Sequence, residues 1–207
     1  MIYISVVCEH PSLDIQKEIA NFDDLIIGEF LDTYENLPIK TFLGYKFLSE
    51  KCMGKYDFVT FTDDDALLDL KNLIRLFAET NKSEPSIHCL KGHPIELRGG
   101  KCKKFLDALA KFQNLNTFLA PHTGKYYLWE ELYPENFKPP AYCNGQCAMM
   151  TSSAADKIYA AARKTNRHEF RLEDFYYVGI LRTKGILRKI FKFFITGTYW
   201  LNSTSFI

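Results

Sequence analysis

The amino-acid sequence predicts an α/β protein with a mixed, mainly parallel sheet flanked by helices. Short apolar runs rich in β-branched and aromatic residues alternate with longer segments whose apolar residues recur at helical spacing. This alternation is typical of strand–helix units that build a largely parallel sheet, in which ligands bind beyond the carboxyl ends of the strands. The length of 207 residues suits one substantial core, so we expect a single domain over residues 1–207.

The first half of the chain contains several short elements with local start signals. Asn36 is a good N-cap, and Pro38 falls in the first turn of the helix behind it, where a missing N–H costs nothing. Asp69 is a plausible cap for a later helix. The elements expected here are a strand over 1–8, a helix from 12, a short strand at 25–27, a helix after 36, a strand over 56–62 and a helix from 70.

The second half combines short strands with a long irregular segment. Ser153 and Asp156 have the spacing of a capping box in front of a helix. In a later helix, Phe175, Val178 and Leu181 would lie on one side, and Gly185 stands in the stop position. The elements expected here are a strand over 86–90, irregular chain over 128–146, a strand over 147–151, helices over 152–164 and 171–186, and a core strand within 189–201.

Charge and hydropathy exclude several classes of protein. The formal net charge is +1, from 26 basic and 25 acidic residues, so no overall field favours a nucleic acid or an anionic membrane surface. No apolar run reaches the roughly 18 residues of a membrane helix, and the first residues lack the features of a signal peptide.

The six cysteines show no zinc-site spacing, and we expect no zinc. The sequence leaves open whether disulfides form, and their connectivity cannot be assigned, because six cysteines allow about 15 pairings. Two glycosylation sequons, at Asn81 and Asn202, would suit a secretory compartment, but such short matches arise easily by chance.

Three successive carboxylates, Asp63, Asp64 and Asp65, follow the apolar strand "YDFVTFT". Neighbouring like charges repel, so the group needs either open water or a bound cation. Along an extended chain Asp63 and Asp65 point to one face and could converge on one ligand. Carboxylates are typical ligands of hard divalent cations that also hold substrate phosphates. The residues alone leave two interpretations open, a solvated acidic turn and a metal and phosphate site.

A second acidic pair, Glu173 and Asp174, stands at the start of a predicted helix. Acidic residues in a first turn complement the helix dipole, a contribution of about 0.3–1 kcal/mol. A carboxylate facing a desolvated pocket can instead act as a general base. The pattern by itself does not separate these two roles.

Four segments in order carry a resemblance to a known family: "FDDLIIGEFLDTYENLPIKT", "YDFVTFTDDD", "YPENFKPPAYCNG" and "EDFYYVG". From about residue 20 to residue 186 the chain resembles the β-1,3-galactosyltransferases of glycosyltransferase family 31. That family includes β-1,3-N-acetylglucosaminyltransferases and is distantly related to the fringe enzymes. The resemblance implies a GT-A fold, a hexosyltransferase activity with inversion, and a UDP-galactose or UDP-N-acetylglucosamine donor held through Mn²⁺.

The resemblance also implies roles for individual residues. Asp65 would coordinate the metal, while Asp63 and Asp64 contact the ribose or orient their loop. Asp174 would be the base that deprotonates a sugar hydroxyl on a glycoprotein or glycolipid glycan, with Glu173 beside it. The remaining implied residues are Lys40 near the acidic loop, and Tyr142, Asn144 and Gly145 bordering the donor sugar and the acceptor.

The sequence departs from the family pattern in two respects. Members usually carry a membrane anchor and then a strand–helix unit with an "R--IR-TW" pattern. Neither is present here, and we expect the chain to begin inside the usual catalytic domain. A metal-binding histidine that often follows the "EDVYVG" motif has no counterpart, because the last histidine is His168.

These departures keep a second function open, a catalytically inactive family member that binds a glycan or pairs with an active relative. The resemblance implies residence in the Golgi lumen or membrane, and it leaves open a homo- or heterodimer with another member.

Overall fold

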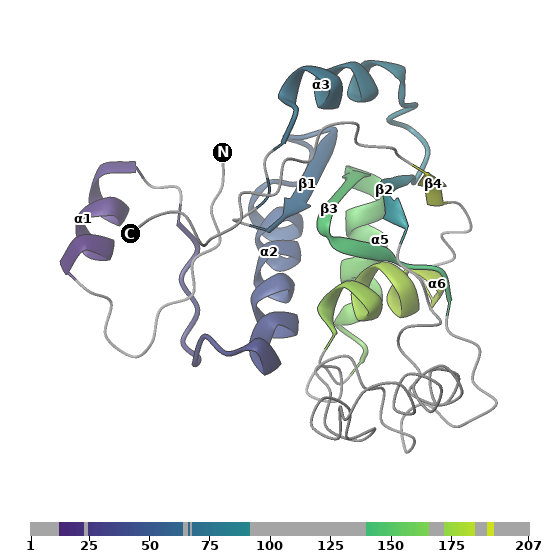
Figure 1. Ribbon diagram of the computed structural model, residues 1–207. Coiled ribbons are helices and arrows are strands. Elements are labelled where there is room, and N and C mark those ends of the chain that lie inside the picture. The colour runs from purple at the N-terminus through teal and green to yellow at the C-terminus, as the bar shows by residue number, and fades with distance from the viewer. Residues whose placement is uncertain are drawn as a thin grey trace, which may run out of the picture.

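The computed structural model describes residues 13–22, 25–63, 66, 68–91, 140–165, 172–184 and 190–192 (Figure 1). Helices and strands both occur within these residues, and from residue 37 to residue 91 they alternate, as the sequence predicts. In chain order they are α1 (Leu13–Phe22), η1 (Tyr34–Asn36), α2 (Leu37–Lys51), β1 (Phe58–Thr62), α3 (Leu70–Glu79), β2 (Ile87–Lys91), β3 (Cys143–Thr151), α5 (Ser152–Ala162), η3 (Phe175–Leu181), α6 (Arg182–Lys184) and β4 (Ile190–Lys192).

The strands form a four-stranded sheet in the order β1-β3-β2-β4. β3 runs antiparallel to both β1 and β2, whereas β2 and β4 are parallel. The prediction of a mixed sheet is confirmed. The prediction that it is mainly parallel is wrong for the described pairings, because the one reversed strand, β3, lies between β1 and β2 and makes two of the three pairings antiparallel.

The reversed direction of β3 determines which of its residues lie beside the carboxyl ends of β1 and β2. Thr62, the last residue of β1, pairs with Cys147, and Lys91, the last residue of β2, pairs with Cys143. The carboxyl ends of β1 and β2 therefore lie beside the first half of β3. We use the term acidic edge for this side of the sheet, because Asp63 follows β1 there.

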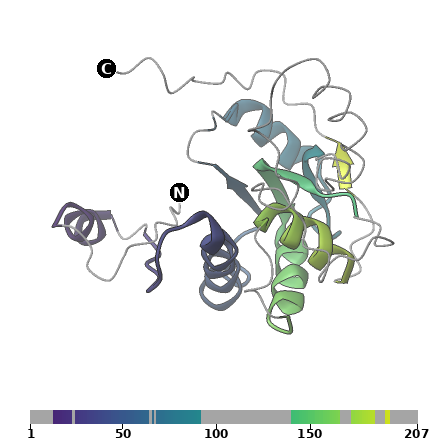
Figure 2. The ribbon, with the colours of Figure 1, turned by 60° about the horizontal axis from the view of Figure 1, so that its bottom comes forward.

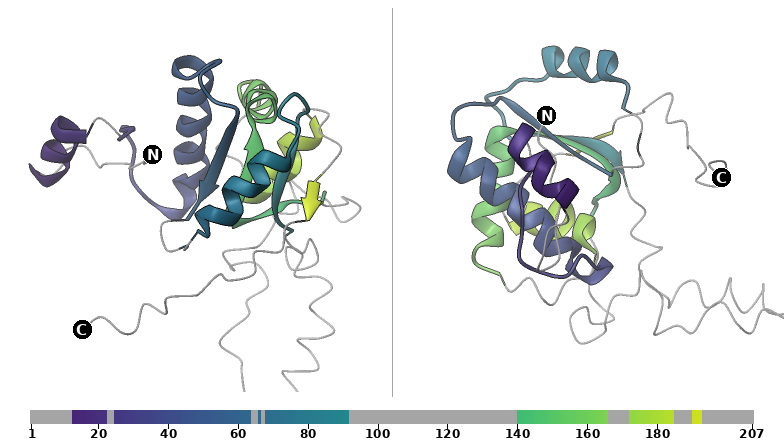
Figure 3. Two further views of the ribbon diagram at one scale, coloured as in Figure 1. Left: turned by 90° about the horizontal axis from the view of Figure 1, so that it is seen from above. Right: turned by 90° about the vertical axis from the view of Figure 1, so that its left-hand side faces the viewer.

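Helices cover both faces of the sheet. The ring of Phe58 stacks on Phe77 of α3, with centroids 4.8 Å apart. Phe61, three residues later in β1, points to the opposite face and packs on Tyr45 of α2 at 4.5 Å. That second face carries α2, α5 and η3 over the buried core (Figure 3). The result is an α/β/α arrangement.

The helices α2 and α5 contact each other over the core (Figure 2). The rings of Phe42 and Tyr159 lie 5.5 Å apart, and the Tyr159 hydroxyl donates to Glu50 Oε1 at 2.8 Å. Tyr45, on the inner side of α2, is buried to 1% exposure and donates to the Met150 sulfur. An aromatic layer thus joins the helices to the sheet.

Two of the predicted helix starts are confirmed. Asn36 is the N-cap residue of α2 and Pro38 lies in its first turn, although the Asn36 amide donates to Leu31 O rather than capping the helix. The carboxylate of Asp69 accepts from Asn72 N at 3.1 Å and caps α3.

The capping box at Ser153 and Asp156 is wrong, because the N-cap of α5 is Thr151, two residues before Ser153, and Ser153 already lies within the helix. The Asp156 carboxylate instead bonds the side chain of Ser49, on the neighbouring helix α2.

Other boundaries also differ from those expected. The short strand at 25–27 is reduced to isolated β-bridges at Leu25 and Glu29. β3 begins at Cys143, so the last residues of the expected irregular segment are extended strand. The expected strand over 1–8, residues 128–139 and the end of the expected strand within 189–201 lie outside the described residues. Within the described part of the chain, none of the helices has the length and apolar character needed to span a bilayer.

Candidate active site

Asp63 is the described member of the acidic triplet, and it lies exposed at the acidic edge. Its carbonyl oxygen accepts from Ala66 N at 3.3 Å, which turns the chain away from β1. Asp64 and Asp65 lie outside the described residues. Burial raises the pKa of the Cys147 thiol, on the neighbouring strand β3. The negative charge of Asp63 adds to this effect, and the pKa reaches about 11. Asp63 therefore lies close to the start of the buried part of β3.

Glu173 and Asp174 lie in the first turn of the helix that continues into η3. The Asp174 carboxylate accepts from Phe175 N at 2.6 Å, a charge-assisted bond that favours the ionised form. Burial chiefly, and then the charges of Asp174 and Asp63, raise the pKa of Glu173 to about 7, against the opposing effect of backbone N–H bonds. The structure thus brings Asp63 within electrostatic reach of Glu173, although the two are far apart in sequence.

The helix behind the acidic pair is π-helical over Phe175–Leu181, and all seven of these residues are buried. Phe175, Val178 and Leu181, predicted to share one side, are all buried, but so are the four residues between them, so burial extends around the whole helix. A helix buried on every side needs apolar residues all round, and FYYVGIL supplies them. Tyr177 fixes its position by donating to Pro38 O at 2.6 Å. π-Helical turns are rare and occur often at functional sites.

A segment leading into β3, residues 140–143, packs against this helix. Arg182 is buried, and its guanidinium donates from Nε to Val178 O and from Nη2 to Ala141 O, each at 3.0 Å. At Gly179 the backbones come so close that an added Cβ would lie 3.1 Å from Tyr142 Cβ. The ring of Tyr142 meets Phe175 edge-on at 5.5 Å.

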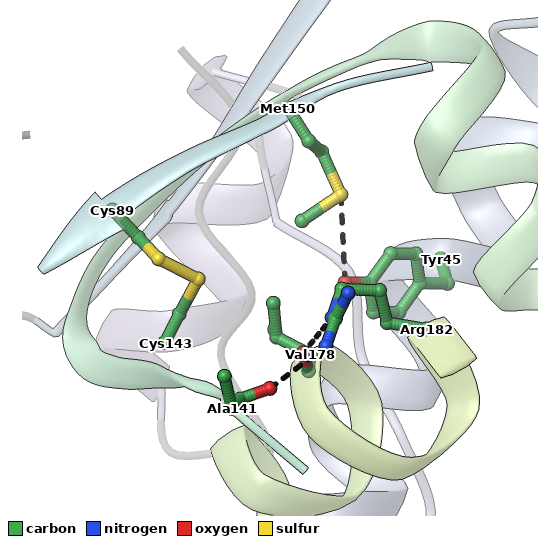
Figure 4. Close-up of a disulfide and its surroundings, with 7 residues drawn as sticks. All are labelled: Tyr45, Cys89, Ala141, Cys143, Met150, Val178 and Arg182. Atoms are coloured by element: carbon green, nitrogen blue, oxygen red, sulfur yellow. Dashed lines mark hydrogen bonds between the residues drawn. A yellow bond between two sulfur atoms is a disulfide. The ribbon is translucent and has the colours of Figure 1, made fainter. Parts of the chain in front are cut away.

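A disulfide holds the same segment from the other side. Cys143 is bonded to Cys89 of β2, with their Cα atoms 5.5 Å apart (Figure 4). Figure 4 shows the disulfide and Arg182 on either side of Ala141. The chain that enters β3 is thereby fixed both to the sheet and to η3. Cys52 and Cys147 are free thiols.

The sequence-predicted residues of this segment are therefore only partly described. Tyr142 is buried against η3, and Asn144 and Gly145 lie within β3. Their register puts them at the acidic edge, because Cys147 already pairs with the last residue of β1. Their predicted contact with a donor sugar and an acceptor stays a prediction.

Lys40 forms an ion pair with Asp32, with Nζ 3.4 Å from Oδ2. This contact joins the start of α2 to the segment before it. The predicted proximity of Lys40 to the acidic triplet stays a prediction, since two of the three aspartates lie outside the described residues.

The predicted metal site is described only in part. In the ranges that the structure describes, no group of three or more His, Cys, Asp or Glu side chains lies close enough to hold a metal ion. The described member, Asp63, offers an exposed carboxylate at the acidic edge, and such oxygen ligands suit hard divalent cations. The predicted ligand Asp65 belongs to the same triplet and stays a prediction.

Sequence reasoning missed Arg182, Gly179 and the Cys89–Cys143 bond. An arginine in the last turns of a helix normally indicates favourable interaction with the helix dipole, and here it is buried. The glycine within an apolar helix was the available signal for close packing. The spacing of the six cysteines gives no indication of which two form the disulfide.

The amino-acid sequence is similar to those of known glycosyltransferases. Residues 10–190 match the family described as galactosyltransferase. The chain is 28% identical over 174 residues to beta-1,3-galactosyltransferase 1 of Homo sapiens, covering 83% of this chain and 45% of that protein. It is 28% identical over 169 residues to UDP-GalNAc:beta-1,3-N-acetylgalactosaminyltransferase 1 of Rattus norvegicus, covering 82% and 43%.

A third relative is more distant. Beta-1,3-galactosyltransferase brn of Drosophila melanogaster is 24% identical over 183 residues, covering 88% of this chain and 49% of that protein. The chain thus spans about half the length of these curated relatives.

Proposed function

We propose that this chain, which belongs to the galactosyltransferase family, is an inverting, metal-dependent β-1,3-glycosyltransferase. It would move galactose or N-acetylglucosamine from a UDP-sugar to a sugar hydroxyl of a glycoprotein or glycolipid glycan. The observation that carries the proposal is that Asp63, after β1, lies near enough to Glu173, at the start of the helix, for its charge to contribute to the raised pKa of Glu173. Both acidic segments, which come from distant parts of the chain, then serve one site.

Asp174 is the proposed base. Its carboxylate accepts the Phe175 N–H, which favours the ionised form that can take a proton. Glu173 beside it holds a proton up to about neutral pH, which reduces the repulsion between the two carboxyl groups. The acceptor oxygen loses its proton to Asp174 while it bonds to the anomeric carbon. The bond from that carbon to the diphosphate oxygen breaks, and UDP leaves.

The acidic triplet is the proposed donor site. Asp65 would hold a divalent cation, Mn²⁺ by family resemblance, which when bound offsets the charge developing on the departing diphosphate, while Asp63 and Asp64 would contact the ribose or orient their loop. Tyr142, Asn144 and Gly145 would border the donor sugar and the acceptor hydroxyl. The support for this is the attachment of residues 140–143 to η3 through Tyr142, to α6 through Arg182 and to β2 through the disulfide. Holding two reactants in fixed positions is itself a large part of catalysis.

A UDP-release assay tests the proposal. Purified protein is incubated with Mn²⁺, a sugar acceptor and UDP-galactose, UDP-N-acetylglucosamine or UDP-N-acetylgalactosamine, the last because one relative's name specifies UDP-GalNAc. We expect acceptor-dependent release with one donor and its loss in Asp174→Asn and Asp65→Ala. The matched control is Asp14→Asn, on the exposed helix α1. UDP binding without release would favour the inactive, glycan-binding or partner role instead.

We also propose that the protein works in an oxidising lumen, such as that of the Golgi. The Cys89–Cys143 bond supports this, since structural disulfides persist in oxidising compartments and are rare in the cytosol. Imaging the tagged protein beside compartment markers tests the location. Native mass measurement tests whether it pairs with itself or with a relative.

A further inference from the structure

We propose that Asn81 carries an N-linked glycan. Asn81, Lys82 and Ser83 match the acceptor pattern Asn-x-Ser, in which x is not proline. Such a match alone is weak, because it says nothing of exposure, position or compartment. The structure supplies all three, and none of them depends on the proposed transferase activity.

The sequon lies in an exposed turn between α3 and β2. Residues 81–84 are all exposed, and Glu84 N donates to Asn81 O at 3.2 Å, which closes the turn. Ser83 N donates to Asn81 Oδ1 at 3.1 Å. That bond involves the carbonyl oxygen of the Asn81 side chain. It does not involve the amide nitrogen Nδ2, which is the atom to which a glycan is attached. A glycan can therefore be added without unpacking any core residue.

The position of the turn keeps a glycan away from the candidate active site. β1 and β2 run in the same direction, since each is antiparallel to β3. Asp63 follows the end of β1, whereas Asn81 precedes the start of β2, so the two lie at opposite edges of the sheet. In Figure 1 α3 lies above the sheet, and the connection from its end descends on the right to β2, with α6 lower down.

Hydrogen bonds and an ion pair also anchor the turn to the sheet. Ser86 N donates to Thr151 Oγ1 at 3.1 Å, and the same hydroxyl donates to Glu84 O at 3.1 Å. Lys82 pairs with Asp57, with Nζ 3.1 Å from Oδ2. A glycan would therefore project from an ordered turn.

The disulfide indicates a compartment in which sequons are also modified. Sequons are modified in the secretory pathway, and structural disulfides such as Cys89–Cys143 persist under the oxidising conditions found there. In the modification, Asn81 Nδ2 attacks the anomeric carbon of a lipid-linked oligosaccharide diphosphate. A C–N bond forms, the bond from that carbon to the diphosphate oxygen breaks, Nδ2 loses one proton, and the lipid diphosphate leaves with the bonding electrons.

Expression in a secretory eukaryotic host tests the proposal. The purified, disulfide-bonded protein is treated with peptide-N-glycosidase, which converts a glycosylated Asn to Asp, and the peptide that contains residue 81 is identified by mass spectrometry. We expect Asp at position 81 after treatment, loss of the modification in Asn81→Gln and Ser83→Ala, and its retention in Ser83→Thr. Asn202→Gln removes the other sequon and is the matched background.

An unmodified Asn81 peptide in secreted, disulfide-bonded protein would overturn the proposal. Modification that persists in Ser83→Ala would also overturn it, because the hydroxyl residue is part of the recognised pattern. UDP release by Ser83→Ala should equal that of the wild type. A failure of the glycan proposal is therefore distinguishable from a failure of the proposed transferase function.

Discussion

The Nη2 atom of Arg182 donates a hydrogen bond to the carbonyl oxygen of Ala141 over 3.0 Å. This bond joins the helix that begins with Glu173 and Asp174 to the chain that enters β3. The bond is also charge-assisted and sheltered, since Arg182 is only 5% exposed. One side chain thus links the two parts of the candidate active site that lie on different elements.

Replacing Arg182 should weaken both stability and catalysis. Arg182→Met leaves the carbonyl groups of Val178 and Ala141 without these donors, and we expect a loss of about 2–4 kcal/mol in the free energy of unfolding. Urea unfolding measures this loss. We also expect kcat/KM for UDP release to fall, with partial rescue in Arg182→Lys.

The control for this variant is Ile158→Ala, a buried core substitution in α5 with a comparable expected loss of about 2–5 kcal/mol. Assayed well below its unfolding transition, it should keep its kcat/KM. Equal kinetic losses in the two variants would reduce Arg182 to a purely structural role.

Two glycines should respond differently to alanine. In Gly179→Ala the new Cβ would lie 3.1 Å from Tyr142 Cβ, so we expect a loss of about 1–3 kcal/mol and a raised KM for the donor or the acceptor. Gly54 has φ of +73° with open space around it, and alanine there costs only about 1–2 kcal/mol of backbone strain. Thermal unfolding and Michaelis kinetics measure both variants. A normal KM in Gly179→Ala would contradict the proposed role of Tyr142.

Reduction of the disulfide should destabilise the folded protein. The bond joins residues 54 positions apart, and in the chain-entropy treatment a loop of that length contributes about 4 kcal/mol. We expect a clear drop in Tm with dithiothreitol and no such drop in a Cys89→Ala, Cys143→Ala double variant. An unchanged wild-type Tm after confirmed reduction would argue against this pairing.

Stability should depend on the ionisation of Glu173. Its pKa is raised from 4.5 to about 7, so between these values the folded chain holds a proton that the unfolded chain has lost. Stability therefore falls as pH rises through this window, by no more than about 3 kcal/mol at 1.36 kcal/mol per pKa unit. Urea unfolding at pH 5 and pH 8 should show this fall, and Glu173→Gln should reduce it. An identical fall in the variant would assign the dependence to other groups.

The elements that local chemistry determines could be predicted from the sequence. Asn36 and Asp69 stand at the N-cap positions of α2 and α3, and Pro38 lies in the first turn of α2, so these helix starts are confirmed. The reversed direction of β3 could not be predicted in the same way, since it depends on pairing with strands far away in the chain. Alternation of strands and helices favours a parallel sheet and does not reveal one strand inserted in reverse.

The candidate site, too, could be predicted from the sequence only in part. The acidic residues were identifiable because three carboxylates after a strand are unusual, but their two segments were linked only through family resemblance. Electrostatic reach between Asp63 and Glu173 is a property of the fold. Arg182 illustrates the opposite case, since its spacing on a helix gives no indication that its guanidinium bonds the chain 41 residues earlier.

The central claim is that the acidic segment after β1 and the acidic start of the helix face one site. The most direct test is to measure the pKa of Glu173 by NMR titration in the wild type and in Asp63→Asn, with Asp57→Asn as the control. Because the charge of Asp63 contributes to the raised pKa of Glu173, the account predicts a lower pKa in Asp63→Asn and no change in the control. An unchanged pKa in Asp63→Asn would contradict the claim, because the two segments would then not share a site.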